Sequence, residues 1–198
     1  MNSEQIRESF LKYFENQDHL RLPSSSLIPI GDPSLLLTTA GMVQFKPYFS
    51  GESAPPHKRL TTSQKSFRTS DIEEVGDDTH LTFFEMLGNF SIGDYFKENA
   101  IHFALDCLES QFSITKNQLS ATVHTSDSES IVLSQKAGKP KERIYKFGDS
   151  ENWWGPAGKT GPCGPDTEIF YWKLNDKKAP KKFNPEDENW VEIWNDVL

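Results

Sequence analysis

The stretch at residues 82–97 reads Thr-Phe-Phe-Glu-Met-Leu-Gly-Asn-Phe-Ser-Ile-Gly-Asp-Tyr-Phe-Lys. Aromatic and large apolar residues dominate its first half, which predicts a β-strand over 81–87. Glu85 and Asn89 are polar residues inside this apolar run. Because buried polar groups need hydrogen-bond partners, we expect both side chains to support the structure of a site rather than to react.

The rest of the chain alternates between helical and extended patterns. A strand over 64–69 is joined to the strand over 81–87 by a long acidic loop, residues 71–79, and long loops in compact domains are often functional. We expect helices over 4–16, 94–111 and 126–138, the last with a capping box of Ser126 and Glu129, and further strands over 35–39, 121–124, 144–147, 167–172 and 190–194. This order predicts an α/β layering of helices around one sheet.

The composition excludes several classes of protein. The chain has 198 residues, 35% of them hydrophobic and 12% aromatic, which predicts a sizeable globular domain. A net charge of −8 argues against a basic surface for nucleic acid. No apolar run is long enough to span a membrane, and the N-terminus lacks the pattern of a signal peptide, so we expect a cytoplasmic protein. The two cysteines, Cys107 and Cys163, are too few and too far apart for a disulfide framework or a zinc site.

Three segments together resemble one known family. The first is 32–47, Asp-Pro-Ser-Leu-Leu running to Met-Val-Gln-Phe-Lys-Pro. The second is 67–97, which contains Phe67-Arg68, the acidic loop and the opening stretch. The third is Thr-Gly-Pro-Cys-Gly-Pro at 160–165, with Glu-Ile-Trp-Asn at 192–195 downstream. In composition and order they are similar to the N-terminal catalytic region of the alanyl-tRNA synthetase family, which belongs to the class II aminoacyl-tRNA synthetases.

The resemblance covers essentially the whole chain and implies a fold and an activity. The implied fold is of the α+β class, an antiparallel sheet flanked by helices. Residues 1–198 would be the N-terminal part of the aminoacylation domain, incomplete at its C-terminus. The third class motif and the domains for tRNA binding and editing are not found after Asn195. The implied activity is that of an alanine–tRNA ligase, present as a truncated catalytic fragment: alanine and ATP form alanyl-adenylate, and the alanyl group passes to the tRNA 3′ end.

The implied ligands follow from this reaction. They are alanine, ATP and Mg²⁺, with tRNA for alanine bound by the complete enzyme and weakly or not at all by this fragment. Mg²⁺ would bridge the phosphates of ATP, and Glu85 is one candidate ligand for it. No residues are assigned to any other metal, and no membrane contact is expected.

Arg68 is the expected catalytic residue. A planar guanidinium suits the charge that builds on the α-phosphate during adenylation. The resemblance assigns the arginine at this position to ATP. On composition alone, the alternative is a surface arginine that pairs with Asp71 or Glu73.

His80 is a further candidate for ATP binding, because an imidazole can donate a hydrogen bond to a phosphate oxygen. Family members often carry two adjacent histidines here, and the second contacts ATP. This chain has Leu81 at the second position. A shift by one residue turns a side chain to the other face of a strand, so the role of His80 is left open.

The remaining candidate residues lie in the last third of the chain. The resemblance assigns Trp154 to the wall of the alanine pocket and to ATP, and the alternative is that Trp153 and Trp154 simply pack on the sheet. It assigns Asn195 to alanine and ATP, and an asparagine amide can pair with either the ammonium or the carboxylate of an amino acid. Ile193 and Trp194 carry family contacts to ATP.

The turn over 161–165 departs from the family pattern at its end. The family commonly has a second cysteine after the second Gly-Pro pair, where this chain has Asp166. The difference counts further against a metal or redox pair, and Cys163 has no histidine near it in sequence that would make it a nucleophile.

A different class of function also fits the chain. It would be a non-catalytic binding module that keeps the synthetase fold. The presence of Arg68, Trp154 and Asn195 favours the enzyme, and the missing third motif favours the module.

Overall fold

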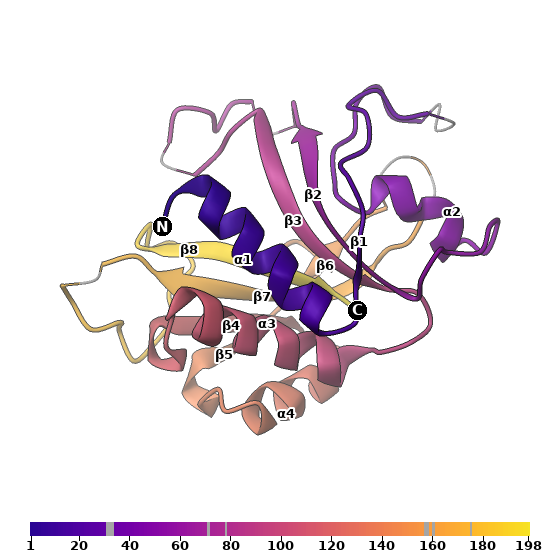
Figure 1. Ribbon diagram of the computed structural model, residues 1–198. Coiled ribbons are helices and arrows are strands. Elements are labelled where there is room, and N and C mark those ends of the chain that lie inside the picture. Colours follow the sequence, from indigo (N-terminus) through magenta and orange to yellow (C-terminus); the bar gives the residue numbers. More distant parts are fainter. Residues whose placement is uncertain (31–33, 71, 78, 157–158, 160, 175) are drawn as a thin grey trace. The chain divides into compact units, whose positions relative to one another are not determined.

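The computed structural model describes residues 1–198 apart from 31–33, 71, 78, 157–158, 160 and 175 (Figure 1). The chain forms two compact units. One consists of Met1–Asp94 with Gly155–Pro162, and the other of Tyr95–Trp154 with Cys163–Leu198. Within the described ranges, no helix has both the length and the apolar character needed to cross a membrane.

The first unit is built on a three-stranded sheet. Its elements are α1 (Ser3–Asn16), β1 (Leu20–Arg21), a 3-10 turn (Val43–Phe45), α2 (Lys46–Phe49), β2 (Arg59–Phe67) and β3 (Phe83–Ser91). The sheet order is β1-β2-β3, with β1 parallel to β2 and β2 antiparallel to β3. The expected strand pair around the acidic loop is therefore confirmed, and its register runs from Arg59 opposite Ser91 to Phe67 opposite Phe83.

Helix α1 begins where the sequence predicts. The Oδ1 atom of Asn2 accepts a hydrogen bond from the backbone N–H of Gln5, and the Gln5 side chain accepts one from the Asn2 N–H, which completes a capping box. The helix buries one face in the core of its unit, formed by Phe10, Leu11, Tyr13 and Phe14.

The second unit contains a larger sheet. Its elements are α3 (Lys97–Phe112), β4 (Leu119–His124), α4 (Ser128–Lys136), β5 (Ile144–Phe147), β6 (Trp153–Trp154), β7 (Gly164–Trp172) and β8 (Trp190–Val197), with 3-10 turns at Lys116–Gln118 and Lys141–Arg143. The strand order is β5-β4-β7-β6, and β8 also pairs with β7. Strands β4 and β5 are parallel, whereas β4, β6 and β8 are each antiparallel to β7.

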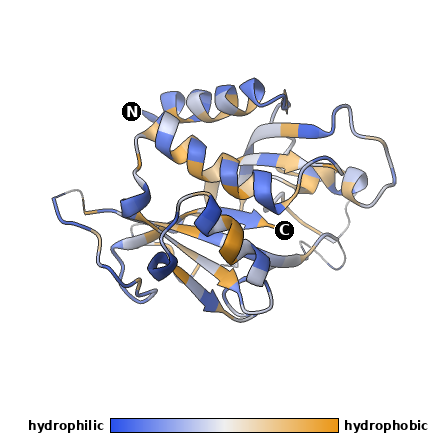
Figure 2. Ribbon diagram, turned by 90° about the horizontal axis from the view of Figure 1, so that it is seen from below, coloured by the Kyte–Doolittle hydropathy of each residue, from blue (hydrophilic) through white to orange (hydrophobic). Residues whose placement is uncertain are grey.

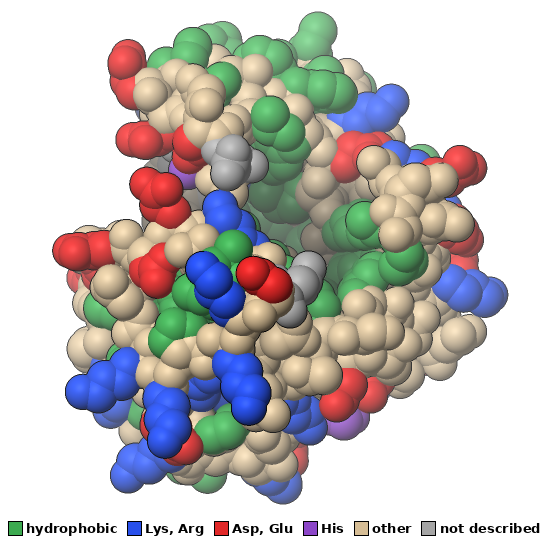
Figure 3. Space-filling model, turned by 90° about the vertical axis from the view of Figure 1, so that its left-hand side faces the viewer, with side chains coloured by type: hydrophobic (Ala, Val, Ile, Leu, Met, Phe, Trp, Pro, Cys, Tyr) green, Lys and Arg blue, Asp and Glu red, His purple; other side chains and the backbone are tan. Residues whose placement is uncertain are grey.

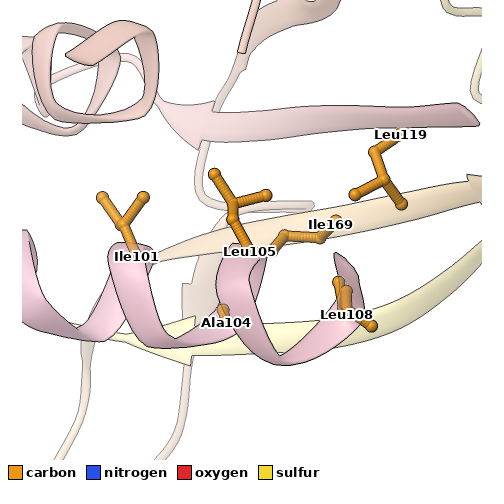
Figure 4. Close-up of a cluster of buried hydrophobic side chains, with 6 residues drawn as sticks. All are labelled: Ile101, Ala104, Leu105, Leu108, Leu119 and Ile169. Atoms are coloured by element: carbon orange, nitrogen blue, oxygen red, sulfur yellow. The ribbon is translucent and has the colours of Figure 1, made fainter. Parts of the chain in front are cut away.

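Helix α3 covers one face of this larger sheet. Figure 4 shows Ile101, Leu105 and Leu108 of α3 beside Leu119 of β4 and Ile169 of β7. Figure 2 shows hydrophobic and hydrophilic residues interleaved along the helices, as expected when one face of each helix is buried. Because side chains alternate along a strand, the neighbours of Ile169 on β7 point to the opposite face of the sheet.

Strand β8 contains a β-bulge that the sequence did not indicate. Ile169 lies opposite Trp194, but the next residue, Phe170, lies opposite Glu192, so Ile193 is an extra residue on β8. The predicted alternation of buried and exposed residues over 190–194 is therefore wrong at Ile193, which is exposed. The bulge keeps Trp194 on the helix-covered face and places Asn195 on the other.

Two further sequence predictions are wrong. Residues 35–39 form no strand, and Leu36 is 94% exposed. The backbone of this stretch bonds to its neighbours at Thr38. The Thr38 N–H donates to the carbonyl oxygen of Leu27, and the Thr38 carbonyl oxygen accepts from the N–H of Phe67. A run of leucines without a partner strand along its length does not form a ladder. The expected single sheet is two sheets.

The N-terminus of α4 also differs in detail. Asp127, not Ser126, caps the helix, because its Oδ1 accepts from the N–H of Ser130 at 3.1 Å. The Ser126 hydroxyl lies 2.6 Å from Nδ1 of His124 and is therefore engaged outside the helix. Asp127 is also a strong capping residue, and local sequence alone does not distinguish two adjacent caps.

Candidate functional site

Arg68 follows directly after β2, at the start of the loop between β2 and β3. Its backbone N–H donates to the carbonyl oxygen of Thr82, which closes the base of the loop. The side-chain Nε donates to the carbonyl oxygen of Thr39 at 2.9 Å, and the guanidinium carbon lies 5.5 Å from the centre of the Phe84 ring. The contact with the aromatic ring and the hydrogen bond to Thr39 restrict the position of the guanidinium.

Asp71 and Glu73 were the alternative partners expected for Arg68. Glu73 makes no ion pair with it among the residues that the structure describes, and Asp71 lies outside them. Asp32, Pro33 and Thr160 of the family-like segments also lie outside the described residues.

His80 is tied to its own loop. Its Nδ1 lies 2.6 Å from Oδ2 of Asp77, and its backbone N–H donates to Oδ1 of the same carboxylate. The hydrogen bonds from His80 and Thr79 lower the pKa of Asp77 well below its usual range. The acidic loop thus ends in a compact turn at Asp77, and the second ring nitrogen of His80 is the one directed away from it.

Glu85 on β3 contacts α1. Its Oε2 accepts from Nη2 of Arg7 at 2.6 Å, and this ion pair joins the helix to the strand. The same contact raises the pKa of Arg7. The position of Glu85 agrees with a supporting role, and its carboxylate already has a cationic partner.

Trp154 lies on β6, the short strand at the edge of the larger sheet. It pairs with Gly164 of β7 and is half-buried, whereas its neighbour Trp153 is 45% exposed and approaches the His124 ring edge-on at 5.9 Å. A Cβ atom on Gly164 would lie 3.0 Å from the carbonyl oxygen of Leu198, so the glycine permits a close approach of β7 to the chain that follows β8.

Ile193 and Trp194 occupy different surroundings. Ile193 is the exposed residue of the bulge, whereas Trp194 packs against the hydrophobic cluster under α3 and donates its indole N–H to Oδ1 of Asp196 at 3.0 Å. The indole of Trp194 therefore lies on the helix-covered face of the sheet.

The opposite face of the larger sheet is apolar in one part, around Trp172 and Trp190, and polar in another, where Asp166 lies. Its two carboxylate oxygens accept from two asparagine amides, Asn152 at 3.0 Å and Asn195 at 3.1 Å. The Asn152 amide also donates to the hydroxyl of Thr122 at 2.9 Å. Asp166 is 2% exposed and Asn152 is fully buried, so this network is an interior one. Burial raises the pKa of Asp166, against the effect of the two amides.

Glu168 extends this polar face toward β8. It lies opposite Asn195 in the β7–β8 register and accepts from the Thr122 hydroxyl at 3.1 Å. Burial, followed by the charges of Glu192 and Asp166, raises the pKa of Glu168 to about 8. A carboxyl group with such a pKa is protonated at neutral pH unless a cation or a ligand approaches it.

The structure thus groups the predicted residues in two sets. Trp154, Ile193, Trp194 and Asn195 lie on strands of the larger sheet, whereas Arg68 and His80 flank the acidic loop of the first unit. Sequence reasoning missed Asn152 and Glu168 and assigned Asp166 no role. The available signal was a set of polar residues within otherwise buried strands.

Metal binding was tested on the same residues. Within the described ranges there is no group of three or more His, Cys, Asp and Glu side chains placed to hold a metal ion. Mg²⁺ bound to nucleotide phosphates needs only one or two carboxylates from the protein. Glu168 and Glu192 lie on the same face of the sheet, and burial, followed by the charge of Glu192, raises the pKa of Glu168, so the pair has the chemistry to receive a divalent cation. Cys107 is buried and Cys163 exposed, and both are unpaired.

An antiparallel sheet with helices on one face and a polar network on the other agrees with the class II aminoacyl-tRNA synthetases. The chain belongs to this class, because the family of class II (A) tRNA synthetases matches residues 5–198. A solved structure of histidyl-tRNA synthetase from S. aureus shares the fold, with a TM-score of 0.55 and 10% identity, over 97% of this chain and 55% of the other.

Within the class, the chain is similar to alanine–tRNA ligases. It is 50% identical to the alanine–tRNA ligase of Dehalococcoides mccartyi over 100% of its length, which is 23% of the relative. It is 49% identical to that of Leptospira interrogans, over 98% of this chain and 21% of the relative. It is 47% identical to that of Rubrobacter xylanophilus, over 100% of this chain and 24% of the relative. The chain therefore spans between a fifth and a quarter of the length of these relatives.

Proposed function

We propose that this chain is the N-terminal part of an alanine–tRNA ligase catalytic domain, and that it contributes the residues that bind ATP and alanine. The observation that carries this proposal is the identity of about half of the residues over the whole chain with alanine–tRNA ligases. In the reaction, a carboxylate oxygen of alanine attacks the α-phosphorus of ATP. A bond from carboxylate to phosphorus forms, the bond to the bridging oxygen breaks, and pyrophosphate leaves.

Arg68 is the proposed catalytic residue in this step. Its Nε is used by Thr39 and its plane is held by Phe84, so the terminal N–H groups are available to the α-phosphate oxygens. Donors that are fixed before the reaction stabilise developing charge without reorganising. His80 is proposed to contact a phosphate oxygen through the ring nitrogen that Asp77 does not hold.

Trp154 and Asn195 are proposed to hold alanine. The half-buried indole of Trp154 limits the space for the side chain, and the amide of Asn195 binds a polar group of the amino acid. Four residues of the same sheet are also proposed to contact ATP. They are Trp154 through its ring, Ile193 and Trp194 through the bulged backbone, and Asn195. Mg²⁺ would neutralise charge on the leaving pyrophosphate, and Glu168 and Glu192 are the side chains that would hold it.

Transfer to tRNA belongs to the complete enzyme. The 3′-terminal hydroxyl attacks the carbonyl carbon of alanyl-adenylate, and AMP leaves. We propose that this part of the chain binds tRNA weakly or not at all, since its net charge is −8, although Lys and Arg side chains gather on part of one face (Figure 3). Such a reaction serves protein synthesis in the cytoplasm.

The test is alanine-dependent exchange of pyrophosphate into ATP, measured on the purified chain. Arg68→Ala is the informative variant, and Arg21→Ala is its matched control because Arg21 pairs with the exposed Glu8 away from the acidic loop. We expect exchange that Arg68→Ala abolishes and Arg21→Ala leaves within about twofold. Activity of Arg68→Ala within about tenfold of the parent would refute the role of Arg68. A folded parent chain without exchange would instead favour a non-catalytic module or a part that needs the rest of the enzyme.

A further inference from the structure

The contacts of Asp166 determine the orientation of two side-chain amides. Its Oδ1 accepts from Nδ2 of Asn152, and its Oδ2 accepts from Nδ2 of Asn195. The three residues come from different segments: Asn152 immediately precedes β6, Asp166 is on β7 and Asn195 is on β8. The carboxylate is thus held from both sides inside the sheet.

The charge of Asp166 leaves each amide one stable orientation. If the Asn195 amide were turned over, its carbonyl oxygen would face the carboxylate and the two acceptors would repel each other. The observed orientation leaves Oδ1 of Asn195 as the atom directed elsewhere. This oxygen has no hydrogen-bond partner among the residues that the structure describes. A buried carbonyl oxygen without a donor lowers the stability of the folded chain until a ligand donates to it.

We propose that Asp166 is a positioning residue for substrate recognition: by accepting from both asparagine amides, it holds Asn195 with its carbonyl oxygen directed toward the ammonium group of the amino-acid substrate. This inference rests on the proposed function and deepens it. An asparagine can bind the ammonium group through Oδ1 or the carboxylate through Nδ2, and Asp166 removes the second choice because it occupies Nδ2. Asn195 then acts as an acceptor only.

The neighbouring groups agree with a cationic ligand. Glu168 lies opposite Asn195 in the strand register, and Glu192 shares the same face. The Thr122 hydroxyl donates to Glu168, and the Asn152 amide donates to Thr122. These two donors are therefore already bonded to acceptors within the sheet. An ammonium group can donate to the Asn195 carbonyl oxygen, which has no partner among the described residues.

Asp166 is also a feature of this chain rather than of the resemblance. At this position the family commonly has a cysteine, whose thiol is a weak acceptor and cannot receive two amides with full charge. The orientation of Asn195 in this chain therefore depends on the carboxylate of Asp166.

The first test reads the amides directly and needs no activity. In the isotope-labelled chain, the side-chain NH₂ signals of Asn152 and Asn195 should be shifted and slow to exchange, because each donates to a buried carboxylate. Asp166→Asn should displace both signals, whereas Asp187→Asn should displace neither. Asp187 is the matched control, since it also accepts from an asparagine amide, that of Asn189, but in a loop outside the sheet.

The second test measures binding of alanine, of propionate, which lacks the ammonium group, and of ethylamine, which lacks the carboxylate. Asp166→Asn should weaken alanine and ethylamine about tenfold or more, since a hydrogen bond to a charged group is lost. It should leave propionate within about twofold, because propionate has no ammonium group that could donate to Asn195.

A double variant that exchanges the carboxylate and the amide of residues 166 and 195 then distinguishes a lost orientation of residue 195 from a general disturbance of the sheet. In the double variant Asp166→Asn with Asn195→Asp, the new amide at 166 can donate to the new carboxylate at 195 and still accept from Asn152. One oxygen at 195 again points to the ligand, so alanine binding should return to within about threefold of the parent.

Three results would overturn the inference. These are amide signals unmoved by Asp166→Asn, equal weakening of alanine and propionate, and a double variant that binds alanine no better than Asp166→Asn. If the parent chain binds no alanine, the proposed function and the ammonium role fail together. The amide signals would still decide whether Asp166 orients Asn195.

Discussion

Replacing Glu168 by glutamine should change how the stability of the chain depends on pH. In the folded chain, burial and the charges of Glu192 and Asp166 raise the pKa of Glu168 from 4.5 to about 8. Between these two values, the folded state keeps a proton that the unfolded state has lost. The unfolded state therefore binds fewer protons, and the free energy of unfolding decreases as pH rises from about 5 to about 8.

The magnitude follows from the size of the shift. Each pKa unit corresponds to about 1.4 kcal/mol, so a shift of between three and four units sets a ceiling of roughly 5 kcal/mol. The side chain is only partly buried, and water screens part of the effect, so we expect a loss of about 1–3 kcal/mol over this range. Glutamine is neutral throughout and still offers an oxygen to the Thr122 hydroxyl, so Glu168→Gln should remove this part of the slope.

The assay is urea unfolding from about pH 5 to about pH 9, without ATP or Mg²⁺. Both the parent and Glu168→Gln are measured, with Glu186→Gln as a control because Glu186 lies in an exposed loop. The two stability curves should diverge between about pH 5 and about pH 8, where only the folded parent keeps the proton, and they should run parallel above that range. Curves for the parent and Glu168→Gln that run parallel from about pH 5 to about pH 8, or a parent that gains stability over this range relative to the variant, would refute the reasoning.

Two further outcomes are expected. Leu105→Ala should reduce the free energy of unfolding by about 2–5 kcal/mol, because Leu105 is 2% exposed between α3 and the sheet. Leu36→Ala, at a 94% exposed position, should be nearly neutral. Equal losses of the two variants in urea unfolding would contradict the assigned core. Trp154→Ala should enlarge the proposed pocket and reduce the preference for alanine over serine in pyrophosphate exchange by about tenfold, and unchanged selectivity would count against the pocket role.

Local structure was predictable where the signal was local. The capping residues before α1, the apolar spacing of α1 and α3, and the apolar strands β3, β4 and β7 are all within a few residues of their predicted bounds. The strand expected over 35–39 failed because a strand depends on a neighbour. The β2–β3 pair succeeded because its two segments are close in the chain and one loop joins them.

The candidate site residues were likewise predictable only where a local motif indicated them. Arg68, Trp154 and Asn195 were identifiable from motif resemblance, and their roles in binding ATP and alanine stay predictions. Asp166 was visible in the sequence only as a departure from the family pattern. Its contacts join residues 14 positions before it and 29 positions after it. No local pattern specifies such pairs.

The sequence alone determined the family, the helices and most of the strands, because these depend on composition, spacing and motifs along a short stretch of chain. The bulge at Ile193 is evident only in the three-dimensional structure, and it places Trp194 and Asn195 on opposite faces of the sheet. The tertiary structure likewise decided the orientation of the Asn195 amide and the protonation of Glu168 at neutral pH. The physical reason is that hydrogen-bond geometry and desolvation arise where distant segments meet, and both depend on burial and strand register.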